Sequence, residues 1–155
     1  MVMKSANPPI RKLQSLLQQG FDALSRGHVE RAGECCRQVL QLQPDLVEGH
    51  FLVGLVALEA RDRKTAFQAF GSVTKLDPGH SAAWAQLAKL FIGEGQLNRV
   101  DAALDEAVKA NPTDPLVHDV LGTVYSRMGE YEIARVWFEK AAKARPDYPP
   151  YLLNL

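Results

Sequence analysis

The sequence predicts an all-α fold in which antiparallel helix pairs stack one on the next as a solenoid. The first observation is a fixed period, because prolines recur every 34 residues, at Pro44, Pro78, Pro112 and Pro146. The second is that each period holds two helical runs of about 14 residues with a short turn between them. The third is a small residue at one position of the first run, which lets the second helix approach closely. These small residues are Gly20, Gly54, Ala88 and Gly122.

The residues between the two runs of each unit set the expected helix boundaries. Gly27, Gly95 and Gly129 fall between the two runs of their units, where glycine suits the left-handed residue that ends a helix. The second unit has Arg61 and Asp62 there instead, so one of these residues must adopt the turn at some cost. The expected helices are 10–26, 29–42, 46–60, 63–76, 80–94, 97–110, 114–128 and 131–144.

The pattern inside the periods resembles the tetratricopeptide repeat, W-x2-L-G-x2-Y, then A-x3-F, then P. The third unit reads Trp84-x2-Leu87-Ala88-x2-Phe91. The fourth reads His118-x2-Leu121-Gly122-x2-Tyr125, then Ala134-x3-Phe138, then Pro146. The resemblance runs from about Ile10 to the C-terminus and implies a right-handed α-solenoid, the superhelix of this family, with Trp84 and Phe138 largely buried.

The resemblance also implies a domain plan for residues 10–155. The four repeats are expected at 13–46, 47–80, 81–114 and 115–148, after a disordered lead-in at 1–9. A partial capping helix is expected at 149–155. Because this tail is short and apolar and lacks a polar cap, its simplest interpretation is that the chain was cut from a longer protein.

Composition narrows the classes of function. The 155 residues are 46% apolar and carry a formal net charge of +0, so no overall field would attract nucleic acid or an anionic membrane. The N-terminus lacks the apolar stretch of a signal peptide, and the longest apolar run, 51–58, is too short to span a bilayer. We therefore expect no nucleic-acid partner, no membrane span and a cytoplasmic location.

No residue pattern predicts catalysis. Cys35 and Cys36 are adjacent and match no zinc or redox spacing, and Cys36 falls on the core phenylalanine position of the first repeat. His50 and His118 occupy the tryptophan position two repeats apart, which favours packing over a shared metal. The phosphate-loop, zinc-protease, dinucleotide and nucleophile-elbow motifs are absent. The sequence predicts no enzyme, no catalytic residues, no cofactor and no metal site.

The resemblance points instead to the first helices of the repeats, which line the concave groove where partner peptides bind in this family. The groove of the first two repeats is expected to be apolar, and later repeats add charged groups. The expected partner-binding residues are Leu17, Phe21, Leu24, Phe51, Leu55, Leu58, Lys89, Asp119 and Arg127. The carboxylate clamp of chaperone adaptors needs Lys, Asn and Arg, but its positions here hold Leu17, Phe21, Leu52, Ala82 and Gln86.

The sequence therefore predicts a non-catalytic scaffold that binds a protein or peptide of unknown identity. Three occupants of the apolar patch stay open: a partner, a second copy in a homodimer, or the chain's own N-terminal segment. One alternative function is a regulatory or substrate-presenting segment at the N-terminus of a larger enzyme, such as a bacterial transferase. Another is a purely structural oligomer.

Overall fold

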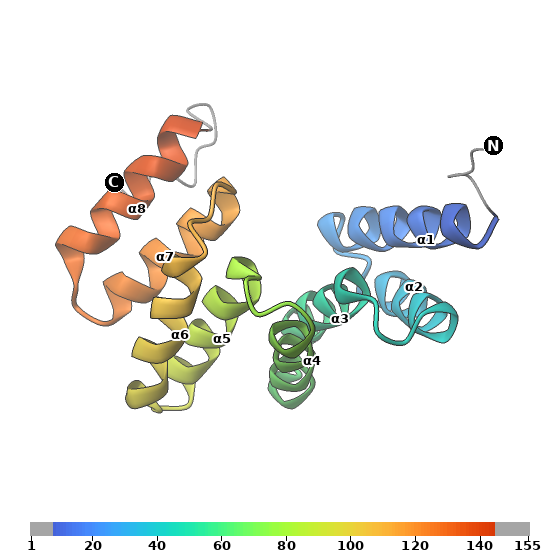
Figure 1. Cartoon of the computed structure of the whole chain (residues 1–155), viewed down its shortest axis with the longest axis horizontal. Coiled ribbons are helices and arrows are strands. Elements are labelled where there is room, and N and C mark those ends of the chain that lie inside the picture. Colours follow the sequence, from blue (N-terminus) through green and yellow to red (C-terminus); the bar gives the residue numbers. More distant parts are fainter. Residues whose placement is uncertain (1–7, 145–155) are drawn as a thin grey trace. The chain divides into compact units, whose positions relative to one another are not determined.

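The computed structural model describes residues 8–144, and this part of the chain contains eight α-helices (Figure 1). Their boundaries agree with the expected helices to within two residues at either end. The helices are α1 Pro8–Ser25, α2 Val29–Leu42, α3 Val47–Glu59, α4 Arg63–Leu76, α5 Ser81–Gly93, α6 Leu97–Lys109, α7 Pro115–Arg127 and α8 Tyr131–Ala144. The all-α fold class, built from antiparallel helix pairs, is confirmed. The expected capping helix at 149–155 lies outside the described residues, as does the lead-in up to residue 7.

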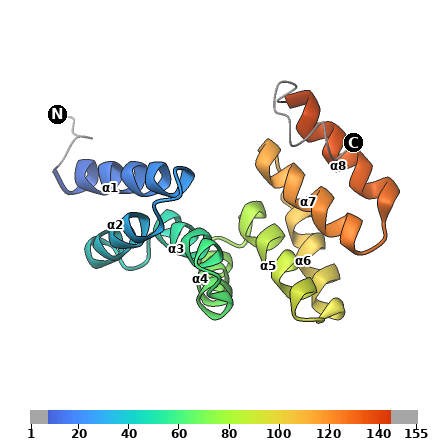
Figure 2. The same cartoon turned by 180° about the vertical axis from the view of Figure 1, so that it is seen from behind.

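The chain forms two compact units, one ending at Pro78 and the other beginning at Gly79. Each unit contains two helix pairs, α1–α2 and α3–α4 in the first and α5–α6 and α7–α8 in the second (Figures 1 and 2). In unit 1, α3 packs against both α1 and α2. In unit 2, α7 packs against α5. We call α1, α3, α5 and α7 the A helices, and α2, α4, α6 and α8 the B helices.

The A-to-B turns have the backbone that the glycines predict. Gly27, Gly95 and Gly129 have φ of 78°, 72° and 81°. Arg61 takes the same left-handed conformation in the second repeat, with φ of 60°, which an arginine adopts only at some cost. Asn111 is also left-handed, at φ 53°, and it follows α6, which ends one residue earlier than expected.

Side chains that cap the helices explain where several of them begin. Asp62 accepts hydrogen bonds from the Thr65 backbone N–H at 3.1 Å and from its hydroxyl at 2.7 Å. His80 Nδ1 accepts from the Ala83 N–H at 3.1 Å, and Asp114 accepts from the Leu116 N–H at 2.9 Å. His80 and Asp114 were expected to be helical, but a capping residue lies outside the helix because its side chain replaces a missing backbone partner.

The recurring small residues mark the closest approaches within the units. A β-carbon added to Gly54 would lie 2.5 Å from the Phe70 ring, and one added to Gly122 would lie 2.6 Å from the Phe138 ring. In the first repeat the matching aromatic is replaced by Cys36, and the added β-carbon at Gly20 would instead meet Leu52 of α3 at 2.5 Å. At these three positions a side chain would meet the neighbouring helix, which explains why they hold glycine.

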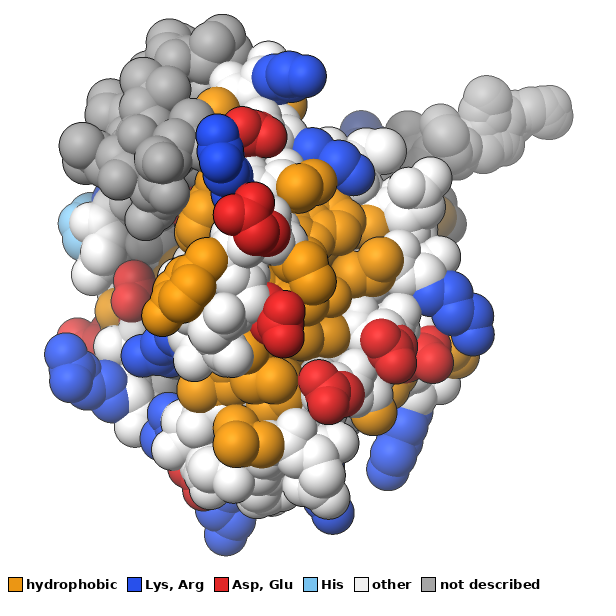
Figure 3. All heavy atoms as spheres, turned by 90° about the vertical axis from the view of Figure 1, so that its left-hand side faces the viewer, with side chains coloured by type: hydrophobic (Ala, Val, Ile, Leu, Met, Phe, Trp, Pro, Cys, Tyr) orange, Lys and Arg blue, Asp and Glu red, His pale blue; other side chains and the backbone are white. Residues whose placement is uncertain are grey.

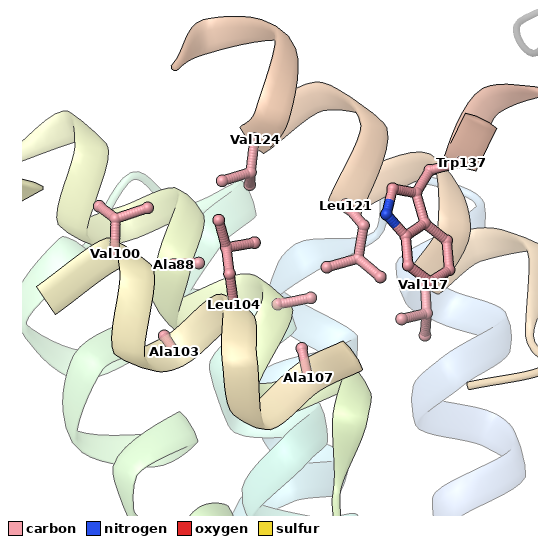
Figure 4. Close-up of a cluster of buried hydrophobic side chains, with 10 residues drawn as sticks. Ala88, Val100, Ala103, Leu104, Ala107, Val117, Leu121, Val124 and Trp137 are labelled. Carbon is pink, nitrogen blue, oxygen red and sulfur yellow. The ribbon is translucent and has the colours of Figure 1, made fainter. Parts of the chain in front are cut away.

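The core of unit 2 gathers side chains from all four of its helices (Figure 4). Leu104 from α6, Leu121 and Val124 from α7, and Trp137 from α8 are buried together. Phe138 is also buried, at 6% exposure, as expected. Trp84 was expected to be largely buried, but it is half-buried and packs against the edge of this cluster.

Candidate functional site

Unit 1 places an apolar surface on its two A helices. This surface consists of six apolar side chains on α1 and α3, which pack side by side, and all six are half-buried. We call this set the apolar A face: Leu17, Phe21, Leu24, Phe51, Leu55 and Leu58. Leu17 and Phe21 are four residues apart on one helix, as are Phe51 and Leu55 on the other, so each pair shares a helix face. Part of every one of these side chains therefore remains open to solvent.

Phe51 has a second role that the sequence did not indicate. Its ring centroid lies 5.6 Å from that of Phe70, with the ring planes tilted by 60°. Phe70 is fully buried, so Phe51 joins the apolar A face to the core of its own helix pair. Tilted aromatic pairs of this kind stabilise a fold beyond the area they bury. Substitutions that probe binding are therefore better placed at Phe21 and Leu55.

The charged residues expected in the groove lie in unit 2. Lys89 is exposed on α5, and Asp119 is half-buried on α7, which packs against α5. Burial raises the pKa of the Asp119 carboxyl, and the nearby Lys89 ammonium partly offsets that rise. Arg127 is exposed at the end of α7, eight residues and roughly 12 Å along the helix from Asp119. The structure thus brings Lys89 and Asp119 together and leaves Arg127 apart.

Asp119 should make stability depend on pH. Because its pKa is raised in the folded state, folding disfavours its charged form, so stability should fall as pH rises through the ordinary aspartate range. Asp119→Asn should therefore melt at a higher temperature than the parent at pH 7. The difference should vanish in acid, where the carboxyl is protonated in both states. Thermal melts of both proteins across this range would check the prediction, and a lower melting temperature at pH 7 would show that the charge on Asp119 is stabilising.

Two of the histidines make the same contact in different units. His50 Nε2 lies 2.7 Å from the Pro44 carbonyl oxygen, and His118 Nε2 lies 2.8 Å from that of Pro112. Because a carbonyl oxygen only accepts, Nε2 must carry the proton in each ring. Each histidine thus ties an A helix to the end of the preceding repeat, a structural role. Among residues 8–144, no three His, Cys, Asp or Glu side chains lie close enough together to hold a metal ion.

The structure also shows an apolar cavity that sequence reasoning missed. Its volume is about 280 Å³, and its walls come from α2, α3 and the start of α4 in unit 1. The lining residues are Gly33, Cys36, Arg37, Leu40, Val53, Val56, Ala57, Ala60, Asp62 and Thr65. None of them belongs to the apolar A face. A usable signal was present in the sequence, since Ala57 occupies the tyrosine position of the repeat.

Comparison with known families agrees with the helix pairs. Two tetratricopeptide-repeat models match the chain, one over residues 57–123 and the other over 117–148, which together cover more than half of it. The chain is a tetratricopeptide-repeat protein. Repeats of this family form protein-interaction scaffolds, and this is the general role of the chain.

Two relatives of this tetratricopeptide-repeat protein are much longer chains. Superkiller complex protein 3 of Mus musculus is 30% identical over 123 residues, which is 78% of this chain but 8% of that protein. Anaphase-promoting complex subunit 3 of Schizosaccharomyces pombe is 22% identical over 121 residues, again 78% of this chain and 18% of that protein. The chain thus spans less than a fifth of either relative.

One solved structure with a similar fold belongs to PilF of Pseudomonas aeruginosa. Its TM-score is 0.75, its sequence is 20% identical, and the match covers 96% of this tetratricopeptide-repeat chain and 68% of that one. At this level of identity the likeness shows the fold alone. Among the described residues, no helix is long and apolar enough to cross a membrane.

Proposed function

We propose that this tetratricopeptide-repeat chain binds an amphipathic helix of a protein partner on the apolar A face of unit 1. The observation that supports this most directly is the set of six half-buried apolar side chains on the adjacent helices α1 and α3. Apolar surface of this kind, when contiguous, is typical of binding sites in soluble proteins. A helix that presents apolar residues at i, i+3, i+4 and i+7 would cover two such A helices.

Acidic residues at the two ends of the apolar A face indicate that the partner helix carries basic residues. Glu48 near the start of α3 and Glu59 at its end are both exposed and lie at opposite ends of the row formed by Phe51, Leu55 and Leu58. Basic residues at the two ends of the bound helix would meet these carboxylates. Such exposed charge pairs influence orientation and association rate more than affinity, so burial of apolar area should supply most of the binding free energy.

A peptide selection provides the test. Random peptides long enough for four helical turns would be displayed on phage and selected on the intact chain. The selected peptides should carry apolar residues with helical spacing. A fluorescent synthetic copy should bind with a dissociation constant that changes little between about 0.05 and 0.5 M salt, since screening acts mainly on charge pairs. Peptides without apolar periodicity would contradict the proposal.

Paired variants locate the binding surface. Phe21→Glu with Leu55→Glu should weaken binding of the selected peptide by at least about tenfold, because two charges would have to be desolvated. The control is Leu42→Glu with Leu76→Glu, which adds the same charge at exposed leucines on B helices. The control should bind like the parent. Equal loss in both variants, or loss in neither while circular dichroism shows both folded, would contradict the proposed surface.

Sedimentation equilibrium separates a peptide partner from a second copy. Under the proposal, the parent chain remains monomeric at the concentrations used for peptide binding. A dimer that Phe21→Glu with Leu55→Glu converts to monomer would show that a second copy covers the apolar A face, and the proposed partner helix would be wrong.

A further inference from the structure

The apolar cavity of unit 1 has an informative counterpart two repeats further along the chain. The 34-residue period places α6, α7 and the start of α8 at the positions of α2, α3 and the start of α4. Cys36, Ala57 and Ala60 of the cavity therefore correspond to Leu104, Tyr125 and Met128. Each residue in unit 2 is much larger than its counterpart in unit 1. The period thus shows which side chains occupy this space when it is filled.

In unit 2 the corresponding space holds an aromatic ring. Tyr125 is half-buried and packs with Met128 against the core cluster that contains Leu104. Burial raises the pKa of the Tyr125 hydroxyl, and the carboxylates of Asp105, Asp101 and Glu130 raise it further. These three acids are the counterparts of Arg37, Gly33 and Asp62, which line the cavity in unit 1. The hydroxyl of Tyr125 therefore lies among the residues whose counterparts surround the cavity.

In unit 1 no side chain of the repeat supplies that ring. Ala57 replaces Tyr125, and Ala60 and Cys36 replace Met128 and Leu104. The result is the cavity of about 280 Å³, close to the lower end of the range for small-molecule sites. Its walls are mostly apolar, and they are held in place by helices that pack directly, because α2 and α3 are in contact.

We propose that this cavity binds the phenol side chain of a tyrosine presented by a partner protein. In unit 1 the partner's tyrosine ring would occupy the position that the ring of Tyr125 occupies in unit 2. It is separate from the apolar A face, since the two share no residue.

The polar residues of the cavity suit a hydroxyl group. Arg37 and Asp62 are both exposed and line it, which gives the cavity a cationic donor and, beside its two bonds to Thr65, an anionic acceptor. A phenol hydroxyl can accept and donate at once. The Arg37 guanidinium binds Glu34 through Nε at 3.0 Å, which leaves its terminal nitrogens for another acceptor. Burial raises the pKa of the Cys36 thiol to about 11, so this wall is uncharged at neutral pH. The apolar part of the lining suits an aromatic ring, and the two exposed polar side chains suit its hydroxyl group.

The probe for the test is p-cresol, which is the tyrosine side chain as a free molecule. Titration of the full isotope-labelled chain should give saturable amide shifts at Gly33, Cys36, Ala57 and Ala60. Toluene, which lacks the hydroxyl, should bind more weakly, and Arg37→Gln should reduce the difference between the two probes. Absence of saturable shifts at these amides, or shifts centred on the apolar A face, would overturn the proposal.

Variants that give one unit the residue found at the matching position of the other provide a further test. Ala57→Tyr supplies the ring internally and should abolish the p-cresol shifts, and Ala60→Met provides a smaller filling change if the first variant does not fold. Tyr125→Ala should create a second set of p-cresol shifts around Leu104 and Met128. Phe21→Glu with Leu55→Glu should leave p-cresol binding unchanged, which separates this site from the proposed peptide surface. Unchanged binding in Ala57→Tyr or Ala60→Met would overturn the proposal.

Discussion

Phe70→Ala is expected to lower the free energy of unfolding by about 3–5 kcal/mol, the usual cost of removing a buried phenylalanine. Phe70 is 0% exposed, and its ring packs against α3 at Gly54 and beside the ring of Phe51. Gly54 has no side chain that could move into the vacated space. The cavity should therefore stay largely open, which places the expected cost toward the upper part of that range.

Urea unfolding followed by circular dichroism would measure this loss as a lower midpoint. The control is Leu76→Ala, which truncates an apolar side chain at the end of the same helix where it is 45% exposed. Its effect should stay within about 0.5 kcal/mol, as for most surface substitutions. A loss below about 1 kcal/mol for Phe70→Ala would show that the Gly54–Phe70 contact is not part of the core of unit 1.

The repeat period is the reason the helices could be predicted from the sequence. Four prolines with one spacing fix the phase of every helix pair, so an error in one repeat is corrected by the others. The exceptions are local. His80 and Asp114 act as caps, and Asn111 takes a left-handed backbone, which asparagine tolerates better than most residues. None of these choices follows from a helical period alone.

The apolar A face could be predicted only as far as its register. Spacing on α1 and α3 places Leu17, Phe21 and Leu55 on the A helices, and the structure finds them half-buried there. The contact between Phe51 and Phe70 depends on how α3 meets α4, which a pattern along one helix does not contain. The exposure of each side chain depends on its neighbours in the same way.

The cavity was missed for a different reason. It is formed by side chains that are too small, and they come from three helices that are separated in sequence. Ala57 alone is an ordinary helix residue, and the cavity arises because Cys36 and Ala60 beside it are small as well. The sequence places Ala57 at the tyrosine position of the repeat, but the packing of α2 against α3 is needed to show that the missing ring leaves a cavity there.

Two glycines in neighbouring helices of unit 1 should respond in opposite directions to the same substitution. Alanine raises helix propensity by about 1 kcal/mol relative to glycine at either position. At Gly71 of α4 an added β-carbon meets nothing within 4 Å, so Gly71→Ala should stabilise the chain by about that amount. At Gly54 of α3 the added β-carbon would lie 2.5 Å from the Phe70 ring. The ring must then move, although Phe51 packs against it.

Gly54→Ala should therefore lower the free energy of unfolding by about 1–3 kcal/mol, the usual cost of overpacking a core, in spite of its better helix propensity. Urea midpoints of the two variants, measured beside the parent, should fall on opposite sides of it. Gly54→Ala should cost less stability in a Phe70→Leu background than in the parent, because the smaller side chain gives the new methyl group room. A double-mutant cycle measures this difference. Equal midpoints for Gly54→Ala and Gly71→Ala would mean that α3 and α4 do not approach each other at Gly54.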